Sequence, residues 1–329
     1  MESPFPKSSS VAGEGEIIAQ LLPNGLSGLK GMSYQYPLKL ISPTPAADQR
    51  SVLVFLLSYG GGLVGGDSVN LSIRTLPGSK LSIVTQGHTK IFKSASPDIV
   101  TRQTLSVHIE DGSGICQLPD PVQPFDGSVY EQTQIFTVAP NASLCLLDWV
   151  TQGRTARGED WSFVKWTGRN EIWLENQVPN QKNRLLVRDT VILDRDSQGL
   201  VGRSLRDTMH GNGLFGTLIL RGSQMQSLGN FFLEEFGALP RIGARDFRSA
   251  EAKAKEESNL TEHELGRLKR IEMETKEGIL WSAARVRGCV IVKFGASTVE
   301  AGRVWIGIML SREGTVARVY GEQALMCVK

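Results

Sequence analysis

Residues 60–74 read GGGLVGGDSVNLSIR, and this stretch decides which class of fold the chain can adopt. With the apolar run 51–57 before it, the spacing Gly60-x-Gly62-x-x-Gly65 formally matches the dinucleotide-binding fingerprint. That site needs a helix that begins at the glycines and an acidic residue about 20 positions later. Here apolar and polar residues alternate over 69–74, and residues 68–97 contain no Asp or Glu. The stretch therefore predicts a sharp turn that leads into a strand.

The same pattern of short strands and turn residues extends to about residue 193. Pro-Gly, Asp-Gly and Pro-Asn pairs interrupt it at 77–78, 111–112, 126–127 and 140–141. Because no helical pattern intervenes, the fold class is predicted to be mainly β, with a core of sandwich or solenoid type. The expected strands are 52–57, 67–76, 80–85, 89–93, 100–109, 114–118, 129–138, 143–150, 161–167, 171–174 and 184–193.

Two or three helices are expected, all in the C-terminal third. Ser223 can cap a helix over 224–236 that carries one apolar stripe, and another helix is expected over 298–312. A strand pair at 279–286 and 288–294 precedes this second helix. Residues 249–278 carry 14 charged side chains, which predicts an exposed helical or partly disordered insertion. A loose N-terminus over 1–15 and a loop over 43–50 complete the expected organisation.

The composition excludes several classes of protein. A formal charge of +2, with 21% charged residues and no basic stripe, gives no indication of nucleic-acid binding. No apolar run approaches the roughly 18 residues that span a membrane, and the first residues do not form a secretory signal. The four cysteines are far apart in the sequence, which favours reduced thiols in a cytoplasmic protein.

Two aspartates are candidates for buried carboxylates. Counting back by two from Val69 reaches Asp67, which would share the apolar face of the strand. Its side chain either satisfies the amides of its own turn or lines a polar cavity. Asp148 lies in a strand that is apolar on both faces, so it is buried whichever way it points. It is either bonded to Lys90 or an arginine, or it belongs to the same cavity.

Other chemistry is weakly represented. Only four histidines are present, with no nucleophile elbow, no Cys-x-x-Cys and no His-Glu-x-x-His, so neither a hydrolase triad nor a permanent metal site is indicated. Arg154 and Glu159 lie in a short charged loop, where a structural ion-pair network is expected. Paired carboxylates drawn from Asp67, Asp148 and Glu159 would also suit a carbohydrate-active enzyme, and the sequence leaves this alternative open.

With these residues identified, the chain resembles the urease accessory proteins called UreD or UreH, in particular the fungal members. The resemblance covers about residues 15–245 and 279–320, as one UreD-like domain that spans 1–329. It rests on four motifs in order: GGLVGGD at 61–67, TKIFKS at 89–94, LPDPVQPF at 118–125, and DW at 148–149 followed by GR at 153–154 and GE at 158–159. The motif positions taken as structural are Gly61, Gly62, Gly65, Gly66, Lys90, Pro121, Phe125, Gly153, Arg154 and Glu159.

The resemblance implies a non-enzymatic assembly factor with a stacked, β-helix-like body. Such proteins bind the urease apoprotein and UreF, which recruits the nickel-carrying GTPase UreG. No cofactor is permanently bound, and nickel passes transiently through the interior. Asp67 and Asp148 match acidic positions of that path, and Thr89 matches a hydroxyl position beside it. The chain departs from the family pattern at Arg188, which is followed by Asp189; either Asp189 substitutes for the family's acid, or this part of the path differs.

The residues and the resemblance agree on one point. A route for a divalent ion should use sparse oxygen ligands that release it, because a closed thiolate or imidazole cage would retain it. We therefore expect a cytoplasmic urease maturation scaffold, with no nucleic-acid or membrane partner. The helices at 224–236 and 298–312 are candidate docking elements for UreF.

Overall fold

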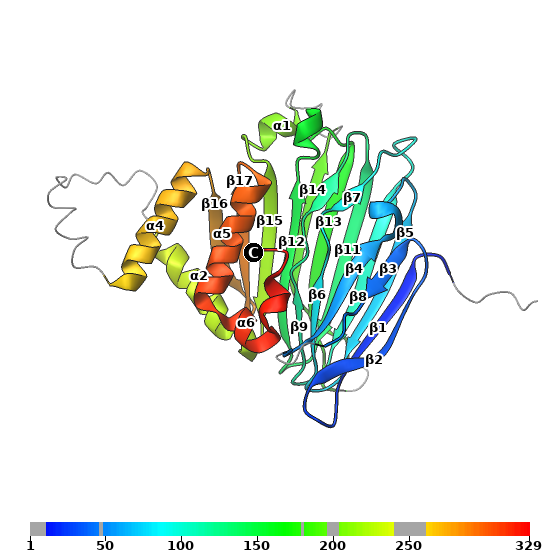
Figure 1. Ribbon diagram of the computed structural model, residues 1–329, viewed down its shortest axis with the longest axis vertical. Coiled ribbons are helices and arrows are strands. Elements are labelled where there is room, and N and C mark those ends of the chain that lie inside the picture. The colour runs from blue at the N-terminus through cyan, green and yellow to red at the C-terminus, as the bar shows by residue number, and fades with distance from the viewer. Residues whose placement is uncertain (1–10, 46–48, 179–180, 196–203, 240–260) are drawn as a thin grey trace, which may run out of the picture.

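The computed structural model describes residues 11–45, 49–178, 181–195, 204–239 and 261–329. Two stacked β-sheets form the body, and helices gather over one end of it (Figure 1). The prediction of a stacked, mainly β fold is confirmed. No helix among the described residues is long and apolar enough to cross a membrane.

One sheet has seven strands. In spatial order they are β14 (Arg184–Asp194), β13 (Lys165–Leu174), β11 (Val129–Val138), β8 (Thr101–Ile109), β5 (Ser68–Thr75), β1 (Glu14–Leu21) and β2 (Ser27–Tyr34).

The other sheet has ten strands. Its main path runs through β16 (Leu280–Val286), β17 (Cys289–Ala296), β15 (Leu214–Arg221), β12 (Ser143–Thr151), β9 (Gly114–Gln117), β6 (Lys80–Val84), β4 (Val52–Ser58) and β3 (Leu38–Ile41). Two short strands, β7 (Thr89–Ile91) and β10 (Val122–Pro124), attach beside β12.

The chain winds between the two sheets. From β4 to β13 the longer strands alternate from one sheet to the other, and within each sheet the successive strands pair in parallel. The turn pairs seen in the sequence make the corners, where Gly78 and Gly112 adopt φ of 72° and 66°. These left-handed values suit glycine and permit a tight change of direction. The winding produces the stacked, β-rich body.

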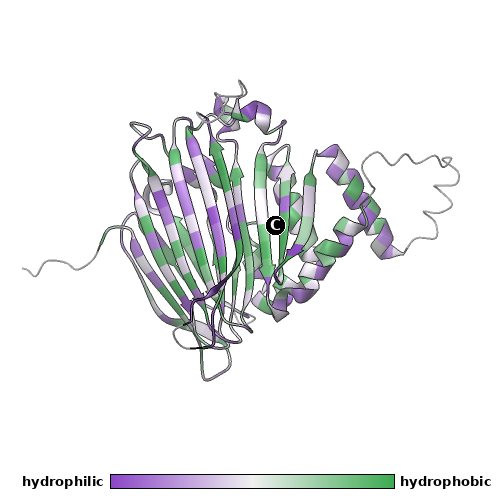
Figure 2. Cartoon of the chain, turned by 180° about the vertical axis from the view of Figure 1, so that it is seen from behind, coloured by the Kyte–Doolittle hydropathy of each residue, from purple (hydrophilic) through white to green (hydrophobic). Residues whose placement is uncertain are grey.

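Three layers enclose two hydrophobic cores. One core lies between the sheets, and the other lies between the ten-stranded sheet and the helices. Strand β12 belongs to both, because Leu144, Leu146 and Val150 face the other sheet whereas Cys145 and Leu147 face the helices. The banding of hydrophilic and hydrophobic residues along the strands in Figure 2 reflects this alternation.

Helices α2 and α5 lie on the outer face of the ten-stranded sheet, over β15–β17, whereas the short α1 lies at one end of the strands (Figure 1). Five α-helices occur among the described residues, more than the two or three expected. The helices predicted over 224–236 and 298–312 correspond to α2 and α5, and α5 is capped by the Thr298 side chain. Their bounds are α1 (Leu205–Thr208), α2 (Gln226–Gly237), α4 (Glu262–Lys276), α5 (Val299–Glu313) and α6 (Thr315–Tyr320).

Several sequence expectations need correction. The strands β1, β2, β3 and β10 were not predicted, and β1 begins at Glu14, inside the range expected to be loose; residues 1–10 lie outside the described part. The ranges 161–167 and 171–174 belong to one strand, β13, since residues 165–174 pair without interruption with β11. Trp161 precedes that strand and adopts φ of 55°.

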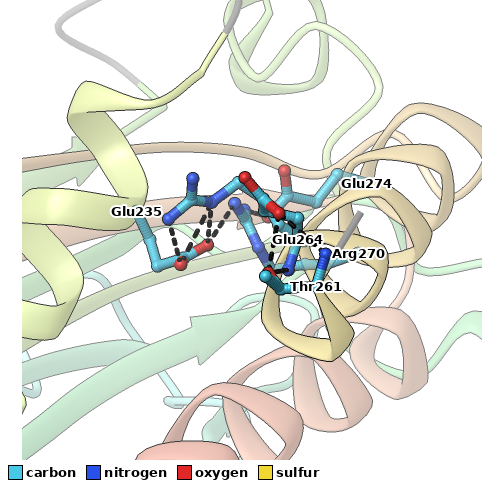
Figure 3. A network of polar contacts seen from close by, with 6 residues as sticks. Glu235, Thr261, Glu264, Arg270 and Glu274 are labelled. Carbon is cyan, nitrogen blue, oxygen red and sulfur yellow. Dashed lines mark hydrogen bonds and ion pairs between the residues drawn. The ribbon is translucent and has the colours of Figure 1, made fainter. Parts of the chain in front are cut away.

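The charged segment also differs from its prediction. Residues 249–260 lie outside the described part, but α4 is held by a buried ion network rather than exposed throughout. Arg270 on α4 is 1% exposed and donates hydrogen bonds to Glu235 of α2 and to Glu274 (Figure 3). Arg267 also pairs with Glu235, and Glu274 accepts the Trp305 indole N–H. Charged residues thus dock this helix because each buried charge has a partner.

Candidate functional site

A row of polar side chains crosses the core between the two sheets. On β11, Gln132 and Gln134 occupy the inward positions between the buried Tyr130 and Phe136. Amide-to-amide hydrogen bonds run from Gln117 to Gln134 and from Gln134 to Asn170, at 2.5 and 2.9 Å. We call the set Gln117, Gln132, Gln134, Asp148 and Asn170 the polar belt.

Asp148 is the one charged member of the belt. Its carboxylate accepts hydrogen bonds from Gln132 Nε2 at 2.9 Å and from Asn170 Nδ2 at 2.7 Å. The expected bond to Lys90 or an arginine is therefore wrong: two neutral amides of the opposite sheet hold the side chain. Burial raises the pKa of the Asp148 carboxyl above its ordinary value, and these two hydrogen bonds oppose that rise.

A small internal cavity adjoins the belt. Its volume is about 30 Å³, enough for one or two water molecules. Asp148 and Thr89, both assigned to an ion path by the resemblance, line it together with belt glutamines and Asp120. Buried Gln117 Oε1 has no hydrogen-bond partner within the described residues. The cavity thus offers an oxygen-rich lining with one unused acceptor.

Asp189 lies close enough to affect this region. It is the cross-strand partner of Asn170 and forms an ion pair with Lys293 Nζ at 2.6 Å. Lys293 in turn contacts Thr217 Oγ1, and Thr217 is the register partner of Asp148 on β15. The negative charge of Asp189 contributes to the raised pKa of Asp148. The acid after Arg188 therefore faces the same interior region as the belt, and it has a cationic partner there.

Asp67 occupies a different environment. Its carboxylate accepts a hydrogen bond from the Val64 amide at 2.9 Å, and its own amide donates to the Val64 carbonyl. This is the turn-aspartate geometry, one of the two alternatives that the sequence left open. Asp67 is half-buried and is not among the residues that line the cavity. The structure therefore brings together Asp148 and Thr89 but not Asp67.

The sequence motifs form one continuous line of contacts. A Cβ placed on Gly62 would lie 2.5 Å from the Phe92 ring, so glycine allows the turn to pass against the 89–94 motif. Phe92 packs edge-on against Phe125 with centroids 5.2 Å apart, and the Arg154 guanidinium lies 3.8 Å from the Phe125 centroid. Arg154 then pairs with Glu159, as the charged loop predicted.

The remaining motif glycines either lie in close contact with a neighbouring residue or adopt positive φ, and Pro121 is buried. A Cβ on Gly65 would lie 3.0 Å from Ser94 Cα, and one on Gly153 would lie 3.0 Å from the Glu159 carboxylate. Gly61 and Gly66 adopt positive φ, and Pro121 is buried. These residues lie in turns and close packing contacts, and their assignment as structural positions stays a prediction.

A surface pocket adjoins the internal cavity. It has a volume of about 710 Å³ and includes His88, Lys90, Arg303 and Cys327 in its lining. Asp120 and Thr85 line both the pocket and the cavity. Asp120 is paired with Arg303 at 2.9 Å and also accepts the Gly87 amide. The Asp120–Arg303 ion pair thus stands where the outer pocket meets the interior.

The cavity lining holds oxygen ligands of several kinds. Among residues 11–45, 49–178, 181–195, 204–239 and 261–329, no three His, Cys, Asp or Glu side chains converge as ligands. Oxygen atoms of amides, two hydroxyls and two carboxylates line the cavity, and such oxygen atoms are hard ligands.

Sequence reasoning missed most of the belt. Gln117, Gln132, Gln134, Asn170 and Lys293 were not singled out. The signal was present on β11, where Gln132 and Gln134 share the parity of Phe136 and Val138 and so had to face the core. Asn170 and Lys293 carried no such signal, because their neighbours across the sheets are set by the winding.

The comparisons with known proteins cover nearly the whole chain. The family model described as UreD urease accessory protein matches residues 14–326. The chain belongs to the UreD family of urease accessory proteins. Family membership identifies the protein as an accessory factor and not as an enzyme, so the carbohydrate-active alternative is set aside.

Curated relatives occur in fungi and bacteria. A UreD-like protein of Schizosaccharomyces pombe, described as an uncharacterized urease accessory protein, is 32% identical over 83% of this chain and 84% of its own length. Urease accessory protein 4 of Cryptococcus neoformans is 28% identical over 86% of this chain and 85% of its own. UreD of an Anaeromyxobacter species is 31% identical over 92% of this chain and 86% of its own length.

Proposed function

We propose that this UreD family member is a maturation scaffold that binds the urease apoprotein and UreF and helps nickel pass from UreG to the urease active site. The observation that carries the proposal is the position of Asp148. It is a buried carboxylate with no direct cationic partner among the residues that the structure describes, and it lies on an internal cavity that Thr89 also lines.

The ion would move along oxygen atoms. A buried carboxylate is costly unless it is paired, and a divalent cation is a partner that can supply the missing charge. The amide donors of Gln132 and Asn170 share the carboxylate, so they limit how tightly a cation can be held. Gln117 Oε1 offers a second acceptor in the same cavity. Weak and sparse ligands of this kind permit release as well as binding.

The surface pocket provides the proposed route to the cavity. Asp120 and Thr85 belong to both spaces, and Arg303 covers Asp120 from the side of α5. Separation of Arg303 from Asp120 would place a carboxylate at the junction. The helices α2 and α5 remain the candidate docking elements for UreF, since both lie on the outer face of the ten-stranded sheet (Figure 1).

The test is co-expression of urease, UreF and UreG with variants of this chain, followed by nickel analysis of purified urease. We expect Asp148→Ala to retain its partners in co-purification but to lower nickel per urease active site severalfold. Thr89→Val should have a smaller effect, because it removes one hydroxyl of the lining. Asp67→Ala enters the same series, because the resemblance assigns Asp67 to the path.

Glu171→Gln is the matched control. Glu171 is also a buried carboxylate, but it pairs with Arg169 and Arg188 and does not line the cavity. If both variants lowered nickel equally, loss of stability would explain the effect. Full nickel loading of urease by Asp148→Ala would exclude Asp148 from the route. Only the proposed role as a binding scaffold would then remain.

A further inference from the structure

A second pocket carries an unusual concentration of positive charge. It has a volume of about 240 Å³ and lies where β14, the β16–β17 turn and the start of α2 meet. Among the described residues, four arginines line it and no Asp or Glu does. We call this space the arginine pocket; its charged residues are Arg184, Arg221, Arg285 and Arg287.

The arginines come from three strands and one turn, and within the part of the chain that the structure describes none of them is paired to a carboxylate in the pocket. Arg221 donates from Nη1 to the Ala142 carbonyl at 2.9 Å and to the Ala139 carbonyl at 3.3 Å. Burial lowers the pKa of Arg221, and the nearby charge of Arg184 lowers it further. Like charges held together in this way are unfavourable until an anion neutralises them.

Arg287 adds a second independent observation. Val286 and Cys289 are register partners, so Arg287 and Gly288 form a two-residue hairpin turn with φ of 48° and 83°. Turns with two positive φ values favour Asn, Asp or Gly, and arginine at the first position is strained. The Arg287 guanidinium donates to the Leu185 carbonyl at 2.9 Å. This hydrogen bond holds the Arg287 side chain beside the pocket.

Hydrogen bonds orient the guanidiniums of Arg221, Arg285 and Arg287, each of which retains further donors. Arg285 donates from Nη2 to Asn230 Oδ1 at 2.7 Å. Each guanidinium has five N–H donors in a fork that matches carboxylate and phosphate oxygens. The N-terminal turn of α2, which includes Gln226, also borders the pocket, so its positive dipole end adds to the field. Leu186, Leu220 and Val290 supply an apolar wall.

We propose that the arginine pocket binds a small free oxyanion ligand, one that carries at least two phosphate or carboxylate groups. The pocket volume suits a compact ligand, since typical sites for larger molecules begin at about 300 Å³. Two groups are expected because four guanidiniums can form two bidentate pairs. This site is separate from the polar belt, and it stands whether or not nickel passes through the interior.

Isothermal titration calorimetry on the full chain tests the proposal. Sodium pyrophosphate and sodium citrate are the two probes, titrated separately at constant ionic strength to distinguish a phosphate from a carboxylate ligand. We expect one-to-one binding of at least one probe. Arg184→Gln combined with Arg285→Gln should weaken that binding about tenfold or more, because charge-assisted hydrogen bonds are lost. Both side chains are exposed, so the substitutions should leave the fold intact.

Arg102→Gln is the control, because Arg102 is 56% exposed on the seven-stranded sheet and does not line the pocket. Binding should be unchanged in this variant. The proposal is overturned if neither probe binds, or if the double variant binds as well as the unchanged chain. Equal weakening in Arg102→Gln would also overturn it, because the probes would then bind by general charge attraction and not in the pocket. If the double variant failed to fold, Arg184→Gln alone would decide by the same criterion.

Discussion

Replacing Arg270 by alanine should detach α4 from the body. The Arg270 guanidinium is 1% exposed and pairs with Glu235 and Glu274, which are themselves 1% and 7% exposed (Figure 3). Removing one partner of a buried ion pair leaves an uncompensated charge and costs about 3–5 kcal/mol. Glu235 would keep its ion pair with Arg267, and Glu274 would keep its hydrogen bond from the Trp305 indole. We therefore expect a loss of stability at the lower end of this range, about 3 kcal/mol.

Arg267→Ala is the matched comparison. Its side chain is 26% exposed, and Glu235 would keep the fully buried Arg270. The loss should therefore be about 1 kcal/mol, near the range of exposed ion pairs. The two variants should then differ by about 2 kcal/mol, close to a 30-fold difference in the docking equilibrium of α4.

Hydrogen exchange of the α4 amides measures this equilibrium directly. Tryptophan fluorescence provides a second signal, because the Arg270 guanidinium lies 5.4 Å from the Trp281 ring, and Trp281 lies 5.4 Å from Trp305. Exchange over residues 262–276 should accelerate far more in Arg270→Ala than in Arg267→Ala. Equal protection in both variants would show that the buried network does not hold the helix.

Two further predictions concern the interior and the turn. Because burial raises the pKa of Asp148, a proton competes with any cation there. Affinity of the isolated chain for Ni²⁺ should therefore rise as pH increases through the raised pKa of Asp148, and equilibrium dialysis should show a flat profile for Asp148→Ala if Asp148 is the ligand. Gly62→Ala would place a Cβ 2.7 Å from the Lys90 carbonyl oxygen and 2.5 Å from the Phe92 ring, so urea denaturation should show a loss of about 1–3 kcal/mol. Gly237→Ala, whose Cβ would meet nothing within 4 Å, should change stability by less than about 0.5 kcal/mol; an equal loss there would contradict the steric explanation.

The sequence alone determined the β architecture of the body. Alternation at Val69, Leu71 and Ile73 specified a strand, and turn pairs marked the corners, because side-chain periodicity and turn chemistry are local properties. The Arg154–Glu159 pair could be anticipated for the same reason, since its members lie five residues apart. Helix α2 also had a local signal in its apolar stripe, but the expected Ser223 cap is wrong, because α2 begins at Gln226 and no side chain among the described residues caps it.

Only the tertiary structure decided which side chains share the interior. Asp148 was recognised as buried, but its partners Gln132 and Asn170 come from the facing sheet, and their proximity depends on how the chain winds. Asp67 satisfied the same parity rule, but β5 begins only at Ser68, and the Asp67 carboxylate accepts the Val64 amide of its own turn. Contacts between distant segments follow from tertiary packing, which the hydrophobic periodicity and the composition of the sequence do not encode.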